Sequence, residues 1–460
     1  MKDKMETAVI LAAGQGTRMK SKTHKVLHTV CGKALIDYAV ELVQGVGVEK
    51  PIVVVGHGAE AVKDHLQGRA LFAQQDPAKG WGTGAAVRAA AQLLPEQGLA
   101  FLLVGDAPLF RAESLAALKQ AVLEGAGCAA LTAVMDDPFG YGRIVKDDEG
   151  FVIDSVEEAE ATPEQKAIRE VNVSLYCVRL ELLRKVLPLL PLHEKKGEYY
   201  LTDMLPLLAG MGEKVVAVQC APEDSFGIND RVQLAQAEKI MRGRILKRHM
   251  LSGVTIVDPD STYIDADVTI GQDSVVYPGC TLQGNTRIGE DCLLLPNCRL
   301  KDAALGNGVT VESSTLLSCQ VQDGTTVGPN AYLRPGTCVG KGCRVGDFVE
   351  LKNSSIGDGT KISHLTYVGD SDLGKNINLG CGVVFVNYDG KEKHRCVVED
   401  DAFIGCNVNL VAPVHVGKGA YIAAGSTIVS DVEPLALSIA RQRQRDIPGW
   451  VQARKDAGKL

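Results

Sequence analysis

The stretch "YIDADVTIGQDSVVYPGCTLQGNTRIGEDCLLLPNCRL" (residues 263–300) carries an aliphatic residue at every sixth position. These positions are Ile264, Ile270, Val276, Leu282, Ile288, Leu294 and Leu300. A six-residue repeat predicts a parallel β-helix, in which each short strand buries one aliphatic side chain and the chain then turns. After a slip the spacing resumes in three further runs: Val321, Val327, Leu333, Val339, Val345 and Leu351; Ile356, Ile362 and Val368; and Val398, Ile404, Leu410, Val416, Ile422 and Ile428.

The segment "HLTYVGDSDLGKN" (364–376) offers a competing interpretation, because Gly369, Gly374 and Lys375 approach the order of a phosphate-binding loop. Asn376 stands where that loop requires Ser or Thr, and no helical pattern follows Lys375. A phosphate-binding loop lies between a strand and a helix. We therefore interpret both glycines as corner residues of the β-helix, where a missing Cβ relieves a tight turn.

The first half of the chain alternates apolar runs with amphipathic ones. We expect strands at "TAVILAAG" (7–14), "PIVVVGH" (51–57) and "LAFLLVGD" (99–106), with helices at 35–46 and 84–97 between them. Such alternation predicts a mostly parallel sheet covered on both faces, with ligands at the carboxyl ends of its strands. From Asn229 to Leu251 one continuous helical pattern follows, which we interpret as a connector.

Composition and charge restrict the class of function. The net charge of −7 argues against nucleic acid as a main ligand. The N-terminal apolar run is too short for a signal peptide, and no apolar stretch is long enough to cross a membrane. The thirteen cysteines include no C-x-x-C pair, which favours reduced thiols in the cytoplasm over a disulfide framework.

Glycine-rich turns and one acidic residue follow the predicted strands of the first half. "LAAGQGTRM" (11–19) follows the first strand, "GWGTGAA" (80–86) leads into a helix, and "VGDAPL" (104–109) ends a strand at Asp106. Turns of this kind let backbone N–H groups surround a phosphate, and a carboxylate in such a place can hold Mg²⁺. With "GYGRI" (140–144), "EVN" (170–172), "GEYYLTD" (197–203) and "GIND" (227–230), the set resembles the sugar-phosphate nucleotidyltransferases.

The resemblance implies a role for individual residues and an in-line attack by a sugar 1-phosphate on the α-phosphorus of a nucleoside triphosphate, with pyrophosphate as the leaving group. The residues implied to bind UTP or UDP-N-acetylglucosamine are Leu11, Ala12, Ala13, Gly14, Arg18, Lys25, Gln74, Gly82, Thr83, Gly142, Glu157, Asn172 and Asn229. The implied Mg²⁺ ligands are Asp106 and Asn229. Extra residues between 75 and 82 leave Gln75 as the alternative to Gln74. "NVS" (172–174) replaces the usual "NTG".

Polar motifs lie on or interrupt the hexapeptide repeat of the second half. They include "YLRPGT" (332–337), "FVELKNS" (348–354), "HLTYVGD" (364–370), "NINLGCG" (376–382) and the insertion "VNYDGKEKH" (386–394). Together with the first half, they resemble the bacterial family of bifunctional enzymes that acetylate glucosamine 1-phosphate and uridylylate N-acetylglucosamine 1-phosphate. The spacing of His, Asp and Glu shows no zinc-site pattern.

This second resemblance implies a complete acetyltransferase site. His364 is implied as the general base, and acetyl-CoA as the acetyl donor. Sugar-phosphate contacts are implied for Arg334, Lys352, Tyr367 and Asn378, and acetyl-CoA contacts for Cys381, Asn387, Tyr388, Cys406, Ala424 and Arg441. The family usually has Ala at the position of Cys381 and Ser at that of Cys406. A homotrimer formed through the β-helix is also implied.

The expected fold class is an α/β Rossmann-like nucleotidyltransferase domain (1–228), a connector helix (229–251) and a left-handed parallel β-helix of hexapeptide repeats with a C-terminal tail (252–460). The expected function is synthesis of UDP-N-acetylglucosamine by acetylation and then uridylylation. Two alternatives stay open at this point: a nucleotidyltransferase whose β-helix only regulates it, and a β-helix that serves only to form trimers.

Overall fold

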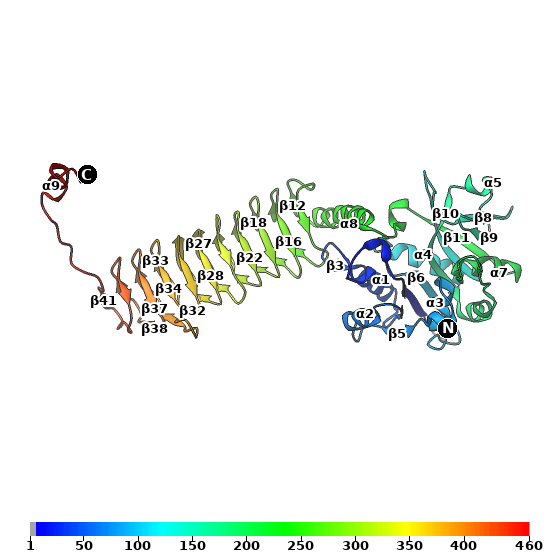
Figure 1. Cartoon of the computed structure of the whole chain (residues 1–460), viewed down its shortest axis with the longest axis horizontal. Helices are drawn as coiled ribbons and strands as arrows, with labels where there is room; N and C mark the ends of the chain where they lie inside the picture. Colours follow the sequence, from blue (N-terminus) through cyan, green and yellow to red (C-terminus); the bar gives the residue numbers. More distant parts are fainter. Residues whose placement is uncertain (1–5, 460) are drawn as a thin grey trace. The chain divides into compact units, whose positions relative to one another are not determined.

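The computed structural model describes residues 6–459, and the chain divides into two compact units. The α/β unit ends at Gly243, and the β-helix unit begins at Arg244. Both units are coloured along the sequence in Figure 1. Each one has its own sheets and core, so each is described by itself.

The α/β unit is built on a twisted sheet with the strand order β11-β7-β10-β6-β1-β4-β5. β1 pairs in parallel with β4 and β6, β4 with β5, and β7 with β11, whereas β10 runs antiparallel to β6 and β7. The strands are β1 (Glu6–Ala12), β4 (Ile52–Val55), β5 (Leu71–Gln74), β6 (Leu99–Val104), β7 (Cys128–Val134), β10 (Glu170–Arg179) and β11 (Val215–Cys220). β8 (Arg143–Lys146) pairs with β10, and β9 (Val152–Val156) pairs with β8. A separate hairpin consists of β2 (Thr29–Val30) and β3 (Lys33–Ala34).

Helices cover both faces of this sheet. They are α1 (Leu35–Gln44), α2 (Ala59–His65), α3 (Thr83–Ala90), α4 (Ala112–Leu123), α5 (Pro163–Lys166), α6 (Leu180–Val186) and α7 (Met204–Gly210). Alternate residues of one strand enter different cores: Ile10 and Phe101 lie in one buried cluster, Val9 and Leu102 in the other. This is the pattern of a sheet buried on both sides, whose strands therefore read as continuous apolar runs.

The expected strands and the helix at 35–46 are present within a few residues of their predicted ends, but the helix expected at 84–97 ends at Ala90, and residues 91–97 lie outside any helix. The expectation of a mostly parallel sheet holds except for β10 and the small β8–β9 pair. β10 has a register shift between Asn172 and Tyr176, and Ser174 within it has φ 60°. A left-handed backbone at this place suits the glycine of "NTG" and strains the serine of "NVS".

The β-helix unit consists of three parallel sheets in which each strand pairs with the equivalent strand one coil later (Figure 1). The first sheet holds β12 (Thr255–Ile256), β15 (Val275–Val276), β18 (Leu293–Leu294), β21 (Thr310–Val311), β24 (Thr326–Val327), β27 (Arg344–Asp347), β30 (Lys361–His364), β33 (Asn378–Leu379), β36 (Phe403–Ile404), β39 (Tyr421–Ile422) and β41 (Leu437–Ser438). The second sheet holds β13 (Tyr263–Ile264), β16 (Thr281–Gln283), β19 (Arg299–Lys301), β22 (Thr315–Leu317), β25 (Tyr332–Leu333), β28 (Glu350–Lys352), β31 (Tyr367–Gly369), β34 (Val384–Val386), β37 (Asn409–Val411) and β40 (Thr427–Ile428). The third holds β14 (Thr269–Ile270), β17 (Arg287–Ile288), β20 (Ala304–Leu305), β23 (Gln320–Val321), β26 (Cys338–Val339), β29 (Ser355–Ile356), β32 (Ser371–Leu373), β35 (Cys396–Val398) and β38 (Val414–Val416).

The repeating aliphatic residues form the core of this coil. Leu282, Leu300 and Leu316 are fully buried and lie in register on β16, β19 and β22. The slip in the repeat after Leu300 comes from shorter edges, since the buried aliphatic residues on the next strands, Leu305, Val311, Leu316 and Val321, follow at intervals of five, six, five and five positions. The fold is a left-handed parallel β-helix of hexapeptide repeats, as predicted.

The glycines that imitate a phosphate-binding loop are corner residues. Gly369 ends β31, and the next elements after Gly374 are strands. A Cβ at Gly374 would lie 2.7 Å from the backbone nitrogen of Asp400 in the next coil. Close stacking of coils, and not phosphate binding, requires glycine there.

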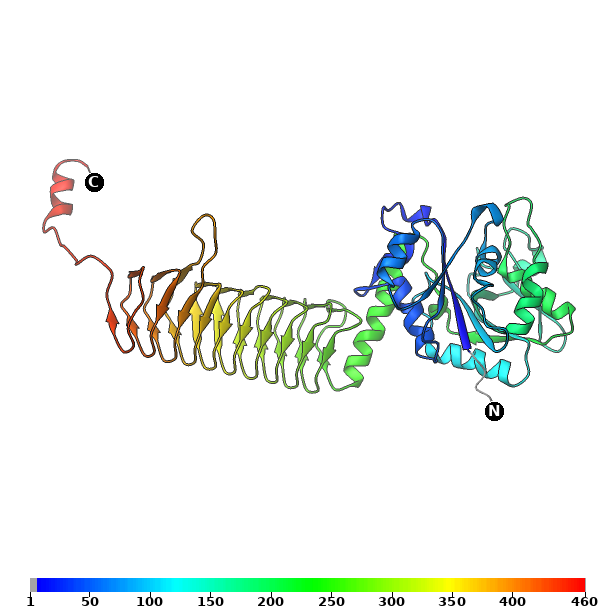
Figure 2. The same cartoon turned by 90° about the horizontal axis from the view of Figure 1, so that it is seen from below.

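One loop leaves the coil, and it coincides with the insertion seen in the sequence (Figure 2). Leu373 of β32 pairs with Val398 of β35, 25 residues later, whereas Ile356 of β29 pairs with Leu373 after only 17. The residues between β34 and β35 form this loop, which we call the 387–395 loop.

The predicted connector is the helix α8 (Arg231–Leu251). The division between the two compact units falls inside it, between Gly243 and Arg244. The domain limits of 228 and 252 stay a prediction. After β41 the chain ends in a short helix, α9 (Trp450–Asp456). Within residues 6–459, no helix is long and apolar enough to cross a membrane.

We expect Leu300→Ala to lower the free energy of unfolding of the β-helix by about 2–5 kcal/mol, because it empties a fully buried position between two other leucines. The adjacent Arg299 is exposed, so Arg299→Ala is the matched control and should change stability by less than about 0.5 kcal/mol. Urea unfolding followed by circular dichroism measures both. Equal losses in the two variants would contradict the inward position of Leu300.

Candidate active sites

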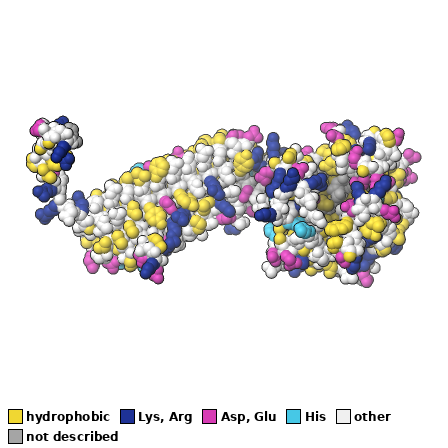
Figure 3. All heavy atoms as spheres, viewed as in Figure 1, with side chains coloured by type: hydrophobic (Ala, Val, Ile, Leu, Met, Phe, Trp, Pro, Cys, Tyr) yellow, Lys and Arg dark blue, Asp and Glu magenta, His cyan; other side chains and the backbone are white. Residues whose placement is uncertain are grey.

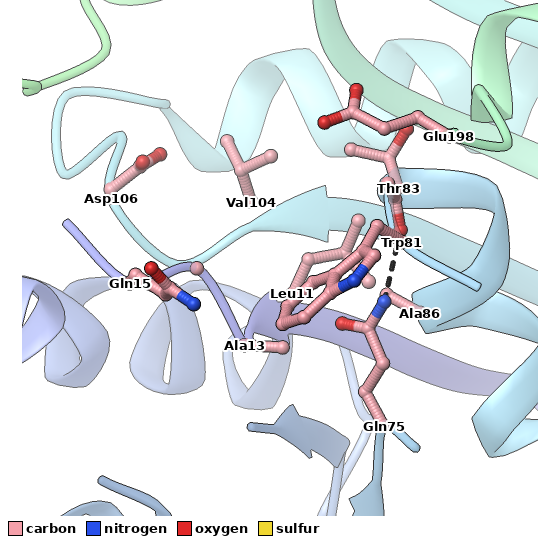
Figure 4. Close-up of a pocket in the computed structure, with 12 residues that line it drawn as sticks. Leu11, Ala13, Gln15, Gln75, Trp81, Thr83, Ala86, Val104, Asp106 and Glu198 are labelled. Carbon is pink, nitrogen blue, oxygen red and sulfur yellow. Dashed lines mark hydrogen bonds between the residues drawn. The ribbon is translucent and has the colours of Figure 1, made fainter. Parts of the chain in front are cut away.

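A cavity of about 460 Å³ opens at the carboxyl ends of β1 and β6 in the α/β unit (Figure 4). It is lined by Leu11, Ala13, Gly14, Gln15, Gln75, Trp81, Gly82, Thr83, Ala86, Val104, Asp106 and Glu198. Six residues predicted from the sequence are in this lining: Leu11, Ala13, Gly14, Gly82, Thr83 and Asp106. The strand ends therefore bring together turns that are far apart in the sequence, as expected for an open α/β sheet.

The glycine-rich turn after β1 is shaped by close backbone contacts. Gly16 has φ 59°, and a Cβ on Gly56 would lie 2.7 Å from the carbonyl oxygen of Ala13. Gly14 is exposed beside the cavity, with no atom within 4 Å of the place of its Cβ. This turn has room for an anionic ligand and free N–H groups to bind it.

Lys25, Asp106 and Asn229 converge at one point. The ammonium of Lys25 forms an ion pair with Asp106 Oδ2 and lies 2.9 Å from Asn229 Oδ1. A backbone hydrogen bond of 3.0 Å from Ile228 N–H to the Asp106 carbonyl holds the two segments together. Both side-chain oxygens thus already face one cation, which is the position that a metal bound by Asp106 and Asn229 would require.

The residues at this point fit Mg²⁺. One carboxylate oxygen and one amide oxygen are hard ligands, and Mg²⁺ in phosphate-transfer sites takes one or two protein ligands with the remainder from water and substrate phosphates. Among the described residues, no group of three or more His, Cys, Asp or Glu residues is arranged to hold a metal ion.

The structure distinguishes the two neighbouring glutamines. Gln75 is buried in the cavity wall, and its Nε2 lies 3.4 Å from each of the Gly80 and Gly82 carbonyl oxygens. Gln74 is exposed and lies outside the cavity lining, where its Nε2 is 3.5 Å from the Gly56 carbonyl. The geometry therefore favours Gln75 over Gln74 as the nucleotide contact.

The three residues expected at the sugar lie together: Gly142 directly before β8, Glu157 directly after β9, and Asn172 on β10. Asn172 N–H donates to the Gly142 carbonyl at 2.9 Å, and a Cβ on Gly142 would lie 3.6 Å from Glu157 Oε1. Burial raises the pKa of Glu157, although Lys196 opposes the shift. The Asn172 side chain is also held by Tyr176, whose hydroxyl lies 2.7 Å from Nδ2.

Arg18 is exposed and lies outside the cavity lining.

The second candidate site follows one corner of the β-helix. Asp347 and His364 are paired residues on β27 and β30, and the register of β30, β33, β36 and β39 carries the same position on to Cys381, Cys406 and Ala424. We call these five residues the corner row. Residues that are far apart in the sequence therefore lie in a line, one per coil.

His364 is held by an acidic partner that the sequence did not reveal. Its Nδ1 lies 2.6 Å from Asp347 Oδ1. The hydrogen bond to His364 lowers the pKa of the Asp347 carboxyl, so this group is an ionised acceptor near neutral pH. A proton on Nδ1 leaves the lone pair of Nε2 directed away from Asp347, which is the arrangement of a general base. The His364 side chain is 53% exposed and therefore accessible to a substrate.

Cations gather on the adjacent sheet. Arg334 follows β25 at the position that Lys352 takes on β28, one coil later. Arg334 NH1 lies 2.8 Å from Glu350 Oε1. The Lys352 ammonium lowers the pKa of Lys393 in the 387–395 loop, which places a third cation beside the first two. Together with Tyr367 on β31, these side chains offer the positive charge and hydrogen-bond donors that binding an anion requires.

The buried carboxylate of Asp370 holds one of these cations, Lys352, in place. Lys352 Nζ lies 3.2 Å from Asp370 Oδ2, and Asn353 donates to Asp370 Oδ1 at 2.6 Å. Asn387 also donates to Asp370, so the loop is tied to the coil at its first residue. Burial alone would raise the pKa of Asp370, but these hydrogen bonds bring it below its ordinary value. Neither Asp370 nor Lys393 stands out in the sequence as a functional residue.

The remaining predicted residues are distributed over two faces. Asn378 lies on β33, in the first sheet, whereas Lys352 and Tyr367 lie in the second. Tyr388 is exposed in the loop and donates its hydroxyl to the Gly390 carbonyl at 2.8 Å. Arg441 lies next to the corner row, because a Cβ on Gly425 would be 3.8 Å from Arg441 Cδ. Within one chain these residues thus line two sides of a corner rather than a closed cavity.

Fold and site together define a nucleotidyltransferase domain followed by a hexapeptide-repeat transferase domain. Residues 8–173 match the MobA-like NTP transferase domain, and residues 395–430 match the bacterial transferase hexapeptide with six repeats. The "Bifunctional protein GlmU" of Thermoanaerobacter pseudethanolicus is 50% identical over 453 residues, covering 98% of this chain and 99% of the relative. The proteins of the same name from Brevibacillus brevis and a Geobacillus species are 49% and 50% identical, covering 95% and 96% of this chain and 95% and 97% of the relatives.

The chain belongs to the GlmU family of bifunctional enzymes. It combines a uridylyltransferase and an acetyltransferase in the synthesis of UDP-N-acetylglucosamine, a cell-wall precursor. Similarity over nearly the whole length supports this bifunctional reading and not a nucleotidyltransferase with a merely structural or regulatory β-helix.

We expect Gln75→Ala to raise KM for UTP roughly tenfold, since it removes the buried amide beside Gly80 and Gly82 and leaves their carbonyl oxygens without that donor. Gln74→Ala is the matched control and should stay within about twofold of the unmodified enzyme. Steady-state pyrophosphate release measures both. A larger effect from Gln74→Ala would restore Gln74 as the contact.

Proposed function

We propose that the α/β cavity binds UTP with Leu11, Ala12, Ala13, Gly14, Gln75, Gly82 and Thr83, and N-acetylglucosamine 1-phosphate with Gly142, Glu157 and Asn172. A phosphate oxygen of the sugar attacks the α-phosphorus of UTP, the bond to the β-phosphate breaks, and pyrophosphate leaves. The observation that supports this most is the convergence of Lys25, Asp106 and Asn229 at one end of the cavity. In such a reaction the protein contributes position and charge neutralisation.

Asp106 and Asn229 would hold Mg²⁺, which supplies positive charge to the phosphates when bound. Lys25 then moves its ammonium from these oxygens to a phosphate oxygen, and Arg18 adds a second cation at the exposed edge of the turn. The ion pair between Lys25 and Asp106 keeps both side chains oriented before substrate arrives.

In the β-helix, we propose that His364 removes a proton from the amine of glucosamine 1-phosphate. The amine nitrogen then attacks the carbonyl carbon of acetyl-CoA, and the thiolate of coenzyme A leaves. Arg334, Lys352, Lys393 and Tyr367 bind the sugar phosphate. The corner row is the observation that supports this proposal. Cys381, Cys406 and Ala424 continue the line of His364, so coenzyme A bound along them would place its thioester next to His364.

The single chain leaves this second site open on one side, and we propose that a homotrimer closes it. Asn378 and Arg441 lie across the corner from Lys352, where they can meet the substrate of a neighbouring copy. Apolar side chains, among them Tyr332, Val386 and Tyr421, are exposed on the coil, and Figure 3 shows such side chains together with Lys and Arg on one of its faces. A cytoplasmic location fits the use of UTP and acetyl-CoA.

The two activities should separate by mutation, because their residues lie in different compact units. Asp106→Ala should reduce uridylyl transfer at least a hundredfold, since Mg²⁺ loses a ligand, and leave acetyl transfer within about twofold. His364→Ala should do the reverse, with a loss of about 10²–10⁴-fold in kcat. Mass spectrometry of the products formed from glucosamine 1-phosphate, acetyl-CoA, UTP and Mg²⁺ measures both. Loss of both activities in either folded variant would refute independent sites.

Asp347 should act on acetyl transfer through His364. We expect Asp347→Leu to lower kcat about tenfold or more with little change in KM for the sugar phosphate, since the imidazole loses the acceptor that fixes its tautomer. Asp347→Glu keeps a carboxylate acceptor and should retain more of the rate than the leucine variant, whereas Asp347→Asn should not, because its amide can donate to Nδ1 and favour the tautomer with the proton on Nε2. Thiol release from acetyl-CoA is the measurement. Unchanged kcat in the leucine variant would show that the contact is only structural.

A further inference from the structure

Trp81 is an aromatic side chain in the wall of the nucleotide cavity, and it is not among the proposed UTP contacts. It shares the lining with Leu11, Gly82 and Thr83, and 41% of its surface is exposed. A partly exposed indole that borders a cavity offers a flat apolar face to a ligand.

The backbone around Trp81 is tightly fixed. Gly80 and Gly82 on either side have φ 114° and 96°, and a Cβ on Gly82 would lie 2.4 Å from the Tyr199 carbonyl oxygen. The Trp81 carbonyl accepts from Tyr199 N–H at 2.8 Å, and Gln75 lies against the carbonyls of both glycines. The indole is therefore presented by a rigid turn, so ordering it costs a ligand little entropy.

The cavity has a charged end and an apolar end. In Figure 4, Asp106 and Gln15 lie toward one side of the cavity, and Trp81, Thr83 and Gln75 toward the other. Asp106 is joined to Lys25, which marks the phosphate and metal end. A nucleotide that places its phosphates there directs its base to the end of the cavity where Trp81, Thr83 and Gln75 lie (Figure 4).

We propose that the indole of Trp81 stacks on the nucleobase of the bound nucleoside triphosphate and is a binding residue for the uridylyl-transfer reaction. The inference rests on the proposed function of the cavity. It also gives a purpose to the extra residues between Gln75 and Gly82, since this stretch is what brings a tryptophan into the wall. Removing one stacked base–aromatic contact weakens binding roughly tenfold.

The chain contains two tryptophans, Trp81 and Trp450, so fluorescence can report on each one separately. In the Trp450→Phe protein, we expect UTP to change the emission of Trp81 with the same Kd that calorimetry gives. Inorganic tripolyphosphate, which has the charges of UTP and no base, should leave the emission unchanged. The Trp81→Phe protein, in which only Trp450 emits, should show no response to UTP.

Kinetics provide the second measurement. Trp81→Ala should raise KM for UTP about tenfold with kcat within about threefold, and Trp81→Phe, which keeps an aromatic face, should raise it less than about threefold. KM for N-acetylglucosamine 1-phosphate should not change. Circular dichroism confirms that each variant is folded.

Two kinds of failure are distinguishable. If calorimetry detects no UTP binding to the unmodified enzyme, the proposed function itself is wrong. If UTP binds while Trp81 emission stays constant, or if tripolyphosphate or N-acetylglucosamine 1-phosphate alone produces the same change, stacking on the base is wrong. Equal KM values for UTP in the alanine variant and the unmodified enzyme would also overturn it.

Discussion

Each edge of the β-helix must bury one aliphatic side chain, and the acetyltransferase site depends on this constraint. Burial of a leucine or valine contributes about 1.5–3 kcal/mol, so the register of the coils is fixed many times over. Once Ile362, Leu379 and Ile404 are inside, the residue two positions after each one must lie at the same corner. The line from His364 to Cys406 is a consequence of core packing.

Polar groups at that corner and on the adjacent sheet are organised by carboxylates as well as by the coil. Asp347 orients His364, while Asp370 holds Lys352 and Asn387. Asp370 is buried, and a buried carboxylate is tolerated only when its hydrogen-bonding capacity is met. The side chains of Lys352, Asn353 and Asn387 donate hydrogen bonds to Asp370. These bonds hold Lys352 and the first residue of the 387–395 loop in place before any phosphate binds.

In the α/β unit, one ion pair orients the charged side chains of the cavity. Lys25 balances Asp106, so neither charge is left alone in the half-buried cavity when substrate is absent. The same carboxylate can serve Mg²⁺ and the same ammonium can serve a phosphate, because both partners keep their charges during the exchange. Charge complementarity at one end and apolar surface at the other give the cavity a direction along which a nucleotide can lie.

The sequence by itself determined the two folds, because periodicity follows from local geometry: the repeat at Ile264, Ile270 and Val276 could suit only a coil that turns every six residues. It also supplied Asp106 and His364 through motifs. It did not distinguish Gln75 from Gln74, because adjacent residues of a turn point in different directions that only the packing of Gly80 and Gly82 decides. Nor did it reveal Asp347, Asp370 or Trp81, whose importance comes from contacts with residues distant in the chain, and such contacts exist only after folding.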